Sequence, residues 1–366
     1  MDDLFTEASR QLTICNSCRY CEGYCAVFPA LERRIDLGAG DITHLADLCH
    51  DCRACYTACM YAPPHEFAVN PPAVLSQVRR RTYARYLPDP PLPRWLRGRG
   101  GTAAAAAAAV VLVVALVVAG HGHGAPGSPY RVIAYPLLLL IAGVPCLWGA
   151  VVLAVAAARY WRDTYGSFRG LLSVRALASA ARHAATLRYL RGGGAGCSYP
   201  ADAPSAARRR LHACVAYGFL ACVASTVAAA IEQDLAGVPP PYAVLSAPVL
   251  FGLAGGIAML AGCCGLILLK RRTDPVPSDP GMTARDYSLL AALAVLAGTG
   301  LLTLLLRGTP AYAPVLAVHL AAVVTSFAIA PYTKFAHFVY RTLALIQDSA
   351  ELITAGDGGK ATRRSP

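Results

Sequence analysis

Eight of the 14 cysteines in this 366-residue chain fall within its first 59 residues, in two runs of four. Both runs have the form C-x2-C-R-x-C-x3-C-x3-P, and the second follows the first at an offset of 34 residues. They comprise Cys15, Cys18, Cys21 and Cys25, and then Cys49, Cys52, Cys55 and Cys59. Thiolates are soft ligands that favour zinc and iron–sulfur clusters, so this repeat is the part of the sequence with the clearest chemistry.

The spacing within each run favours clusters of the cubane type. Cysteines at i, i+3 and i+6 wrap a short loop around one corner of a cubane, and the fourth reaches across to the other cluster. We therefore expect two [4Fe–4S] clusters, one held by Cys15, Cys18, Cys21 and Cys59, the other by Cys49, Cys52, Cys55 and Cys25. The pattern resembles two-cluster ferredoxins. Its proline comes four residues after the last cysteine, which is nearer to the di-cluster modules of respiratory iron–sulfur subunits.

Zinc and disulfides fit this pattern less well. Structural zinc usually takes two C-x2-C pairs separated by a longer loop, and disulfides are rare in cytoplasmic proteins. The six other cysteines share no spacing, and we interpret them as small buried residues: Cys146, Cys197, Cys214, Cys222, Cys263 and Cys264.

Histidines provide a second set of candidate ligands. His319 and His337 are 18 residues apart, which is five helical turns and a rise of about 27 Å, so their imidazoles share a face near opposite membrane surfaces. This arrangement suits two b-type haems, with His212 as the partner of His337, and His121 or His123 as the partner of His319. The alternative is that they are interfacial histidines without a metal.

The composition indicates which elements position these groups. The chain is 56% hydrophobic and 15% charged, against about 25% charged in ordinary soluble domains. Six apolar spans have about the length that crosses a bilayer. We predict an all-α fold, a small di-cluster ferredoxin-like helical module fused to a six-helix transmembrane bundle, with spans near 103–119, 133–158, 211–231, 247–269, 286–306 and 313–335.

The distribution of charge predicts the orientation. Ten arginines lie between Arg159 and Arg210, and Lys270-Arg271-Arg272 opens the next loop on the same side, whereas the other side is nearly free of basic residues. The positive-inside rule then places both termini in the cytoplasm. The N-terminus has no secretory signal, so we expect a multi-pass protein of the inner (cytoplasmic) membrane. The net charge of +12 is thereby explained without nucleic acid.

Four segments follow from these patterns. We expect the two-cluster module at 1–70, a Pro/Arg-rich connector at 71–101, the membrane domain at 102–340 and a cytoplasmic tail at 341–366. Within the connector, residues 72–87 are predicted to form a short helix, which lies either at the lipid headgroups or in solvent. Within the membrane domain, the 159–210 segment predicts a basic amphipathic helix on the cytoplasmic surface.

The cysteine runs, the segment Tyr61-Ala-Pro-Pro-His-Glu-Phe-Ala-Val-Asn70 and the spans together resemble the tricarballylate (citrate) utilization protein B family. They also resemble the C-terminal half of the cobalt-corrin ring-contraction flavoprotein. The first resemblance implies that a partner FAD-dependent dehydrogenase oxidises tricarballylate to cis-aconitate. The membrane protein would then reoxidise its flavin through two iron–sulfur clusters and haem, delivering electrons to quinone.

The residues favour the same class, an electron-transfer subunit without catalytic residues of its own. No strand–glycine–helix fingerprint for flavin or nicotinamide is present, so the donor is expected to be another protein. The segment Pro63–Asn70, together with Arg79–Arg85, is one candidate for the surface on which this donor docks. The alternative is that Pro63–Asn70 is a rigid loop that packs over the clusters. Two alternatives stay open: a subunit supporting flavin-dependent corrin hydroxylation, and a transporter with a regulatory metal module. The few carboxylates in the spans, such as Glu232 and Asp234, disfavour the transporter.

Overall fold

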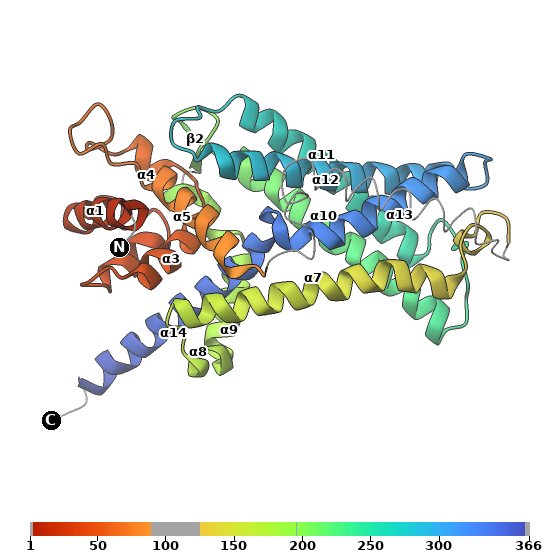
Figure 1. Ribbon diagram of the computed structural model, residues 1–366, viewed down its shortest axis with the longest axis horizontal. Helices are drawn as coiled ribbons and strands as arrows, with labels where there is room; N and C mark the ends of the chain where they lie inside the picture. The colour runs from red at the N-terminus through yellow and green to blue at the C-terminus, as the bar shows by residue number, and fades with distance from the viewer. Residues whose placement is uncertain (1–2, 89–124, 195, 363–366) are drawn as a thin grey trace.

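The computed structural model describes residues 3–88, 125–194 and 196–362, and these residues are predominantly helical (Figure 1). The helices are α1 Asp3–Cys18, α2 Val27–Glu32, α3 Ala39–Leu48, α4 Ala54–Thr57, α5 Pro71–Tyr86, α7 Tyr135–Asp163, α8 Phe168–Leu172, α9 Val174–Ala185, α10 Ala207–Ala230, α11 Ala247–Arg271, α12 Pro280–Leu305, α13 Tyr312–Ile329 and α14 His337–Thr362. Short helical turns are η2 Pro129–Arg131, η3 Arg188–Gly194, η4 Ile231–Leu235, η5 Ala330–Tyr332 and η6 Lys334–Ala336. Strands β1 (Cys197–Ser198) and β2 (Pro204–Ser205) form a two-stranded antiparallel sheet.

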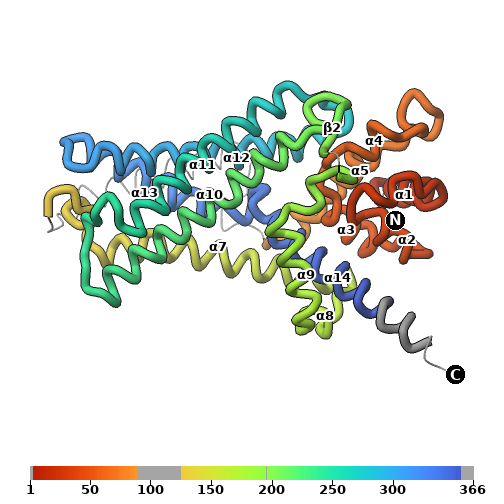
Figure 2. The backbone as a smooth tube through the Cα atoms, turned by 180° about the vertical axis from the view of Figure 1, so that it is seen from behind, coloured from red at the N-terminus to blue at the C-terminus, as the bar shows by residue number. Residues whose placement is uncertain are grey.

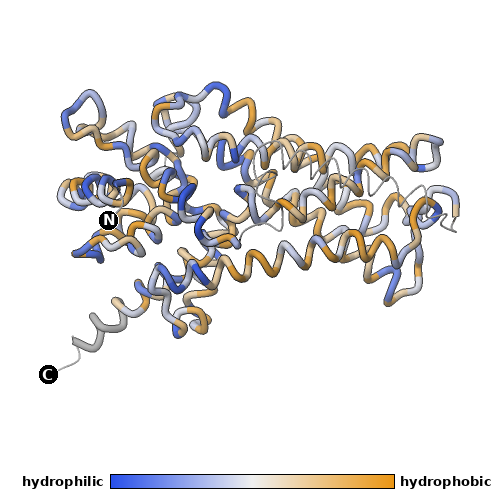
Figure 3. The backbone as a smooth tube through the Cα atoms, viewed as in Figure 1, coloured by the Kyte–Doolittle hydropathy of each residue, from blue (hydrophilic) through white to orange (hydrophobic). Residues whose placement is uncertain are grey.

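Among the described residues, five helical segments are long and apolar enough to cross a membrane, which confirms five of the six predicted spans. They run side by side as the orange bundle of Figure 3 and comprise Tyr135–Asp163, Ala207–Leu235, Ala247–Arg271, Pro280–Leu305 and Tyr312–Tyr332. Most of their side chains are not buried within the described part of the chain, as expected for helices that lipid surrounds. The first predicted span, 103–119, lies outside the described residues.

The two ends of the bundle are different. At one end the N-terminal helices pack against it, and Arg159 near the end of α7 donates to the Tyr86 carbonyl oxygen at 3.1 Å (Figure 1). At the other end, the Tyr135 hydroxyl donates to the Asp234 carboxylate at 2.9 Å. The chain therefore leaves α5 at the module end and begins α7 at the opposite end.

The N-terminal module extends beyond the boundary predicted at residue 70. Helix α5 contributes Val74, Leu75 and Val78 to the same buried core as α1 to α3, so it is neither a headgroup helix nor a solvated one. The apolar residues recur at helical spacing, and this outweighs the arginines between them. Helix α14, most of which falls in the tail predicted at 341–366, adds Tyr340 and Leu345 to this core.

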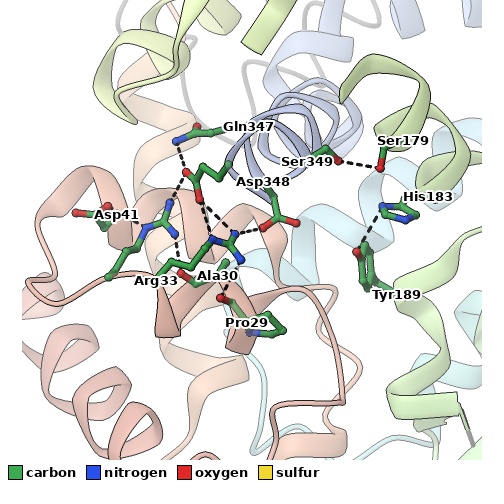
Figure 4. A network of polar contacts seen from close by, with 12 residues as sticks. Pro29, Ala30, Arg33, Asp41, Ser179, His183, Tyr189, Gln347, Asp348 and Ser349 are labelled. Carbon is green, nitrogen blue, oxygen red and sulfur yellow. Dashed lines mark hydrogen bonds and ion pairs between the residues drawn. The ribbon is translucent and has the colours of Figure 1, made fainter. Parts of the chain in front are cut away.

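A polar network fixes α14 to the module (Figure 4). Arg33 pairs with Asp348 and Glu351, and Arg34 pairs with Glu351 at 2.8 Å. On its other side α14 packs against α9, where the Ser349 hydroxyl donates to Ser179 at 3.2 Å. Figure 2 shows α8 and α9 lying beside α14 at the module end of the bundle.

The predicted amphipathic helix is present as α9, in which Ala176 and Ala180 are buried and Arg175 and Arg182 are exposed. Nearby, Phe168, Leu172 and Val174 are each more than three-quarters exposed. An exposed apolar row flanked by arginine is typical of a helix at a membrane surface.

Helices α10 and α11 approach each other closely at three glycines. A Cβ on Gly218 would lie 2.7 Å from the Met259 nitrogen, and one on Gly255 would lie 2.7 Å from the Gly218 carbonyl oxygen. A Cβ on Gly262 would lie 2.8 Å from the Leu211 carbonyl oxygen. Small residues at these positions let the two backbones touch, as in other membrane helix pairs.

Candidate functional site

The eight cysteines of the repeat lie on α1, α4 and the loops around them. Cys15 and Cys18 are in the last turn of α1, and Cys55 is within α4. The other five lie in loops or at helix ends: Cys21, Cys25, Cys49, Cys52 and Cys59. The short helices thus bring both runs into one compact region of the module.

The structure brings Cys15, Cys18, Cys21 and Cys59 together. All four line one cavity of about 140 Å³, which Tyr20, Met60 and Cys55 also border. Burial raises the pKa of Cys15 to about 12, and the thiols of Cys59, Cys21 and Cys18 raise it further. The fourth member of this group comes from the other run, which is the crossed arrangement that the spacing predicts.

The second group lies deeper in the protein. Cys49 and Cys52 are buried, and burial raises the pKa of Cys25 to about 12, with Cys49 as its strongest thiol neighbour. Burial also raises the pKa of Cys55 well above its ordinary value, and Cys25 and Cys49 are its strongest thiol neighbours. Cys25 therefore sits with the second run, as Cys59 sits with the first.

The backbone of both runs bends in the same way. Arg19 and Arg53, which follow the second cysteine of each run, have φ angles of +55° and +65° in the left-handed region. This conformation is unfavourable for a non-glycine residue, so its repetition marks a loop shape that the cysteines require. In the second run, the Asp51 N–H also donates to the Cys49 sulfur at 3.4 Å.

Within the described ranges, no three cysteine sulfurs lie within 4.8 Å of one another. The three metal-ligating side chains that do meet this distance are His44, Asp348 and Glu351. Thiolates around one zinc ion would be about 3.8 Å apart, given Zn–S bonds of about 2.3 Å. The cysteine groups are therefore wider than a mononuclear zinc site, which fits a multi-iron cluster. The carboxylates of Asp348 and Glu351 are already paired with arginines.

Arginines tie the second cysteine run to the membrane helix α10 and to α14. Arg208 of α10 donates to the Asp51 carbonyl oxygen at 2.6 Å, and Arg341 of α14 donates to that of Cys49. Arg79 of α5 donates to the Cys49 carbonyl oxygen at 3.1 Å. Arg79 is buried, so it cannot belong to the docking surface considered for Arg79–Arg85. These cations suit an anionic group, since a buried negative charge needs compensating positive charge.

The structure brings His212 and His337 together, the pair expected at the module end. Their ring centroids are 6.4 Å apart and their planes are nearly perpendicular, at 89°. Nδ1 of His337 lies 2.5 Å from the Lys334 carbonyl oxygen, to which it donates in the tautomer that leaves Nε2 free. Burial lowers the pKa of His337 to about 3, with Arg341 and Lys334 adding to the shift, so the ring is neutral.

The histidine pair and the second cysteine run are neighbours. Arg208 lies one helical turn before His212, and Arg341 lies one turn after His337, a rise of about 6 Å in each case. Both arginines bond to the segment from Cys49 to Asp51. His50 in this segment is buried, and Arg341, Arg208 and His212 all contribute to lowering its pKa.

The other candidate histidines stand apart from this pair. His319 lies within the α13 span and shares a hydrogen bond of 3.1 Å with the Thr299 hydroxyl. Gly300 faces its ring, where a Cβ would lie 3.0 Å from Cε1. Its predicted partners, His121 and His123, lie outside the described residues.

Cys197 contacts the second cysteine run, and no sign of this contact is visible in the sequence. It is fully buried in β1, where its thiol donates to the Leu190 carbonyl oxygen at 3.5 Å, and the N–H of the next residue, Ser198, donates to the Cys52 carbonyl oxygen at 3.1 Å. The neighbouring Cys52 thiol and the charge of Arg208 lower the pKa of Cys197 to about 6, although burial opposes the shift. No spacing signal joins Cys197 to the repeat, because the loop that carries it reaches the module only through the fold.

Comparisons with known proteins cover nearly the whole chain. The family model described as the Fer4-like domain of citrate utilization protein B matches residues 8–85, and the model for citrate utilization protein B matches residues 96–357. The chain is 37% identical to citrate utilization protein B from Escherichia coli over 352 residues, covering 94% of this chain and 92% of that protein. No solved structure matches it.

Proposed function

Because the chain belongs to the citrate utilization protein B family, we propose that it reoxidises a partner FAD-dependent dehydrogenase and passes the electrons to quinone. The match to a Fer4-like domain and the five apolar spans make it a membrane protein with an iron–sulfur electron-transfer role. The partner, the haem and the quinone are our proposal.

In this proposal the eight cysteines hold two [4Fe–4S] clusters. Cys15, Cys18, Cys21 and Cys59 hold the outer one, and Cys25, Cys49, Cys52 and Cys55 hold the inner one. When bound, each cluster supplies a site that accepts and returns one electron. The chain contributes the burial that excludes water, the arginines that offset negative charge, and the Asp51 N–H that bonds to a ligand sulfur.

His212 and His337 hold a b-type haem in the same proposal. The ring centroids of the two imidazoles lie 6.4 Å apart, which supports a role for both as ligands of one haem. The hydrogen bond from Nδ1 of His337 to a backbone carbonyl oxygen is the usual way in which a ligating histidine is oriented. His319, with His121 or His123, would hold a second haem.

One observation carries the proposal: both helices that bear the histidine pair are bonded to the backbone of the second cysteine run, one turn away from each histidine. A metal module on a transporter would not need this proximity, whereas electron transfer from the inner cluster to a haem does.

The proposed orientation places the module and both termini in the cytoplasm, where a soluble dehydrogenase could reach them, with the bundle in the inner membrane. The arginines at the module end support it. At the opposite end, Arg131 and Arg307 are accompanied by Glu232 and Asp234.

The test is an electron-transfer assay on the purified protein in detergent. We expect tricarballylate dehydrogenase, reduced by its substrate, to produce the absorption bands of reduced haem, and a soluble quinone to reoxidise them. Reduction by dithionite but not by the dehydrogenase would contradict the proposed donor. Reduced haem that quinone leaves unchanged would contradict the proposed acceptor.

A further inference from the structure

The two cysteine groups differ in how far they are open to solvent. Cys18 of the outer group is exposed, whereas Cys49 and Cys52 of the inner group are buried. Figure 1 shows α1, and α4 with the loop that follows it, at the end of the molecule away from the bundle. The outer group is therefore the more accessible of the two to a second protein.

Exposed apolar side chains surround this outer group. Tyr20 is 63% exposed and Met60 is 69% exposed, and both border the cavity that the outer cysteines line. Phe67, 40% exposed, packs against Tyr61 with ring centroids 5.7 Å apart. We name Tyr20, Met60, Tyr61 and Phe67 the receiving face. Such an apolar cluster with aromatic residues and methionine is typical of the centre of a protein interface.

We propose that the receiving face is where the reduced flavoprotein docks, so that electrons enter at the outer cysteine group and leave by the inner group toward His212 and His337. The inference rests on the proposed function and adds the point of contact and the direction. The direction follows from the order of the two cysteine groups. The inner group is bonded to the helices that carry His212 and His337, so electrons from a donor at the outer group pass through the outer group and then the inner group.

The electrons balance within one chain. The reduced flavin of the donor gives up two electrons and releases two protons to solvent, and its flavin becomes oxidised. The two clusters accept one electron each, so both electrons can stay on the clusters until the haem and quinone remove them. No further oxidant or reductant is needed.

A second opening competes for this role. A cleft of about 640 Å³ lies beside Cys25 of the inner group, and Arg182, Arg188 and Arg191 line it. A donor docking there would bypass the outer group. Docking there would depend more on salt, because the three arginines outnumber Glu22 and Asp348 in the lining of the cleft. The four side chains of the receiving face carry no charge, and the exposed Arg19 and Glu66 next to them are opposite in sign.

The experiment is stopped-flow reduction of the full-length protein by substrate-reduced tricarballylate dehydrogenase. Met60→Gln and Phe67→Gln should each slow the second-order rate about thirtyfold, the loss expected for an interface hot spot. Glutamine is chosen because a carboxylate here would also alter the reduction potential of the nearby group. Ile35→Gln is the matched control, since Ile35 is 97% exposed on another loop of the module.

Three readouts keep the outcomes distinct. Reduction by dithionite and the electron paramagnetic resonance signal of the clusters should be unchanged in each variant, which shows that the clusters are intact. Wild-type rates should change little between low and high salt. If Met60→Gln and Phe67→Gln react like wild type, or if Arg188→Gln and Arg191→Gln are the slow variants, the receiving face is wrong although the proposed function stands. If the dehydrogenase does not reduce even the wild type, the proposed donor fails instead.

Discussion

Replacement of Gly262 by alanine tests the packing that places His212. A Cβ at this position would lie 2.8 Å from the Leu211 carbonyl oxygen and 2.9 Å from the Val215 nitrogen, whereas ordinary Cβ contacts begin at 3.4 Å. Helix α10 would therefore have to move by about 0.6 Å, the difference between 3.4 and 2.8 Å. Both close atoms belong to the backbone, so no side-chain rotation can relieve the contact.

The expected cost follows from two opposing effects. Overpacking of this kind costs about 1–3 kcal/mol, and alanine regains about 1 kcal/mol over glycine in helix propensity. Gly298→Ala on α12 is the matched control, because a Cβ there would meet nothing within 4 Å and only the propensity gain applies. The difference between the two variants should thus be about 1–3 kcal/mol.

The assay is unfolding by sodium dodecyl sulfate in mixed micelles, followed by circular dichroism. Gly262→Ala should be less stable than Gly298→Ala by the stated difference. Since Leu211 precedes His212, Gly262→Ala should also perturb the haem absorption bands. A Gly262→Ala protein as stable as Gly298→Ala would refute the close α10–α11 contact.

Three further predictions concern other parts of the chain. Asp286→Asn leaves Lys270 and Lys334 without their shared carboxylate and should lower the free energy of unfolding by about 3–5 kcal/mol in the same assay. Glu7→Gln, which breaks the exposed ion pair with Arg10, should lower it by less than about 1 kcal/mol. Equal effects of the two variants would contradict a buried triad of Asp286, Lys270 and Lys334. His212→Ala and His337→Ala should each remove the same haem from the reduced spectrum, and His183→Ala on α9 should not; unchanged spectra in both variants would exclude the pair as ligands. A reporter fused after Pro366 should signal the cytoplasm, and an external signal would overturn the orientation.

The spacing of the cysteines predicts a crossed grouping, in which Cys59 joins the first run and Cys25 the second. In the structure Cys59 lines one cavity with Cys15, Cys18 and Cys21, and the ligand assignment stays a prediction. The five described spans were equally predictable, since length and hydropathy alone identify them.

The sequence could not show how the module is completed. Helix α5 looked like a basic connector because its arginines dominate the composition, yet Arg79 is buried and bonds to the Cys49 carbonyl oxygen. Likewise, the contacts of Arg208, Arg341 and Cys197 with the second run join positions about 150 to 290 residues apart. Such contacts depend on the tertiary fold and leave no local pattern.

The central claim is that the two cysteine groups hold iron–sulfur clusters, and iron and acid-labile sulfide content tests it most directly. Protein purified without oxygen should contain about eight cluster irons and about eight sulfides per chain, with any haem iron counted separately by the pyridine haemochrome method. Cys18→Ser should lower the cluster content, whereas Cys146→Ser, outside the repeat, should leave it unchanged. A protein that contains zinc without sulfide would contradict the account.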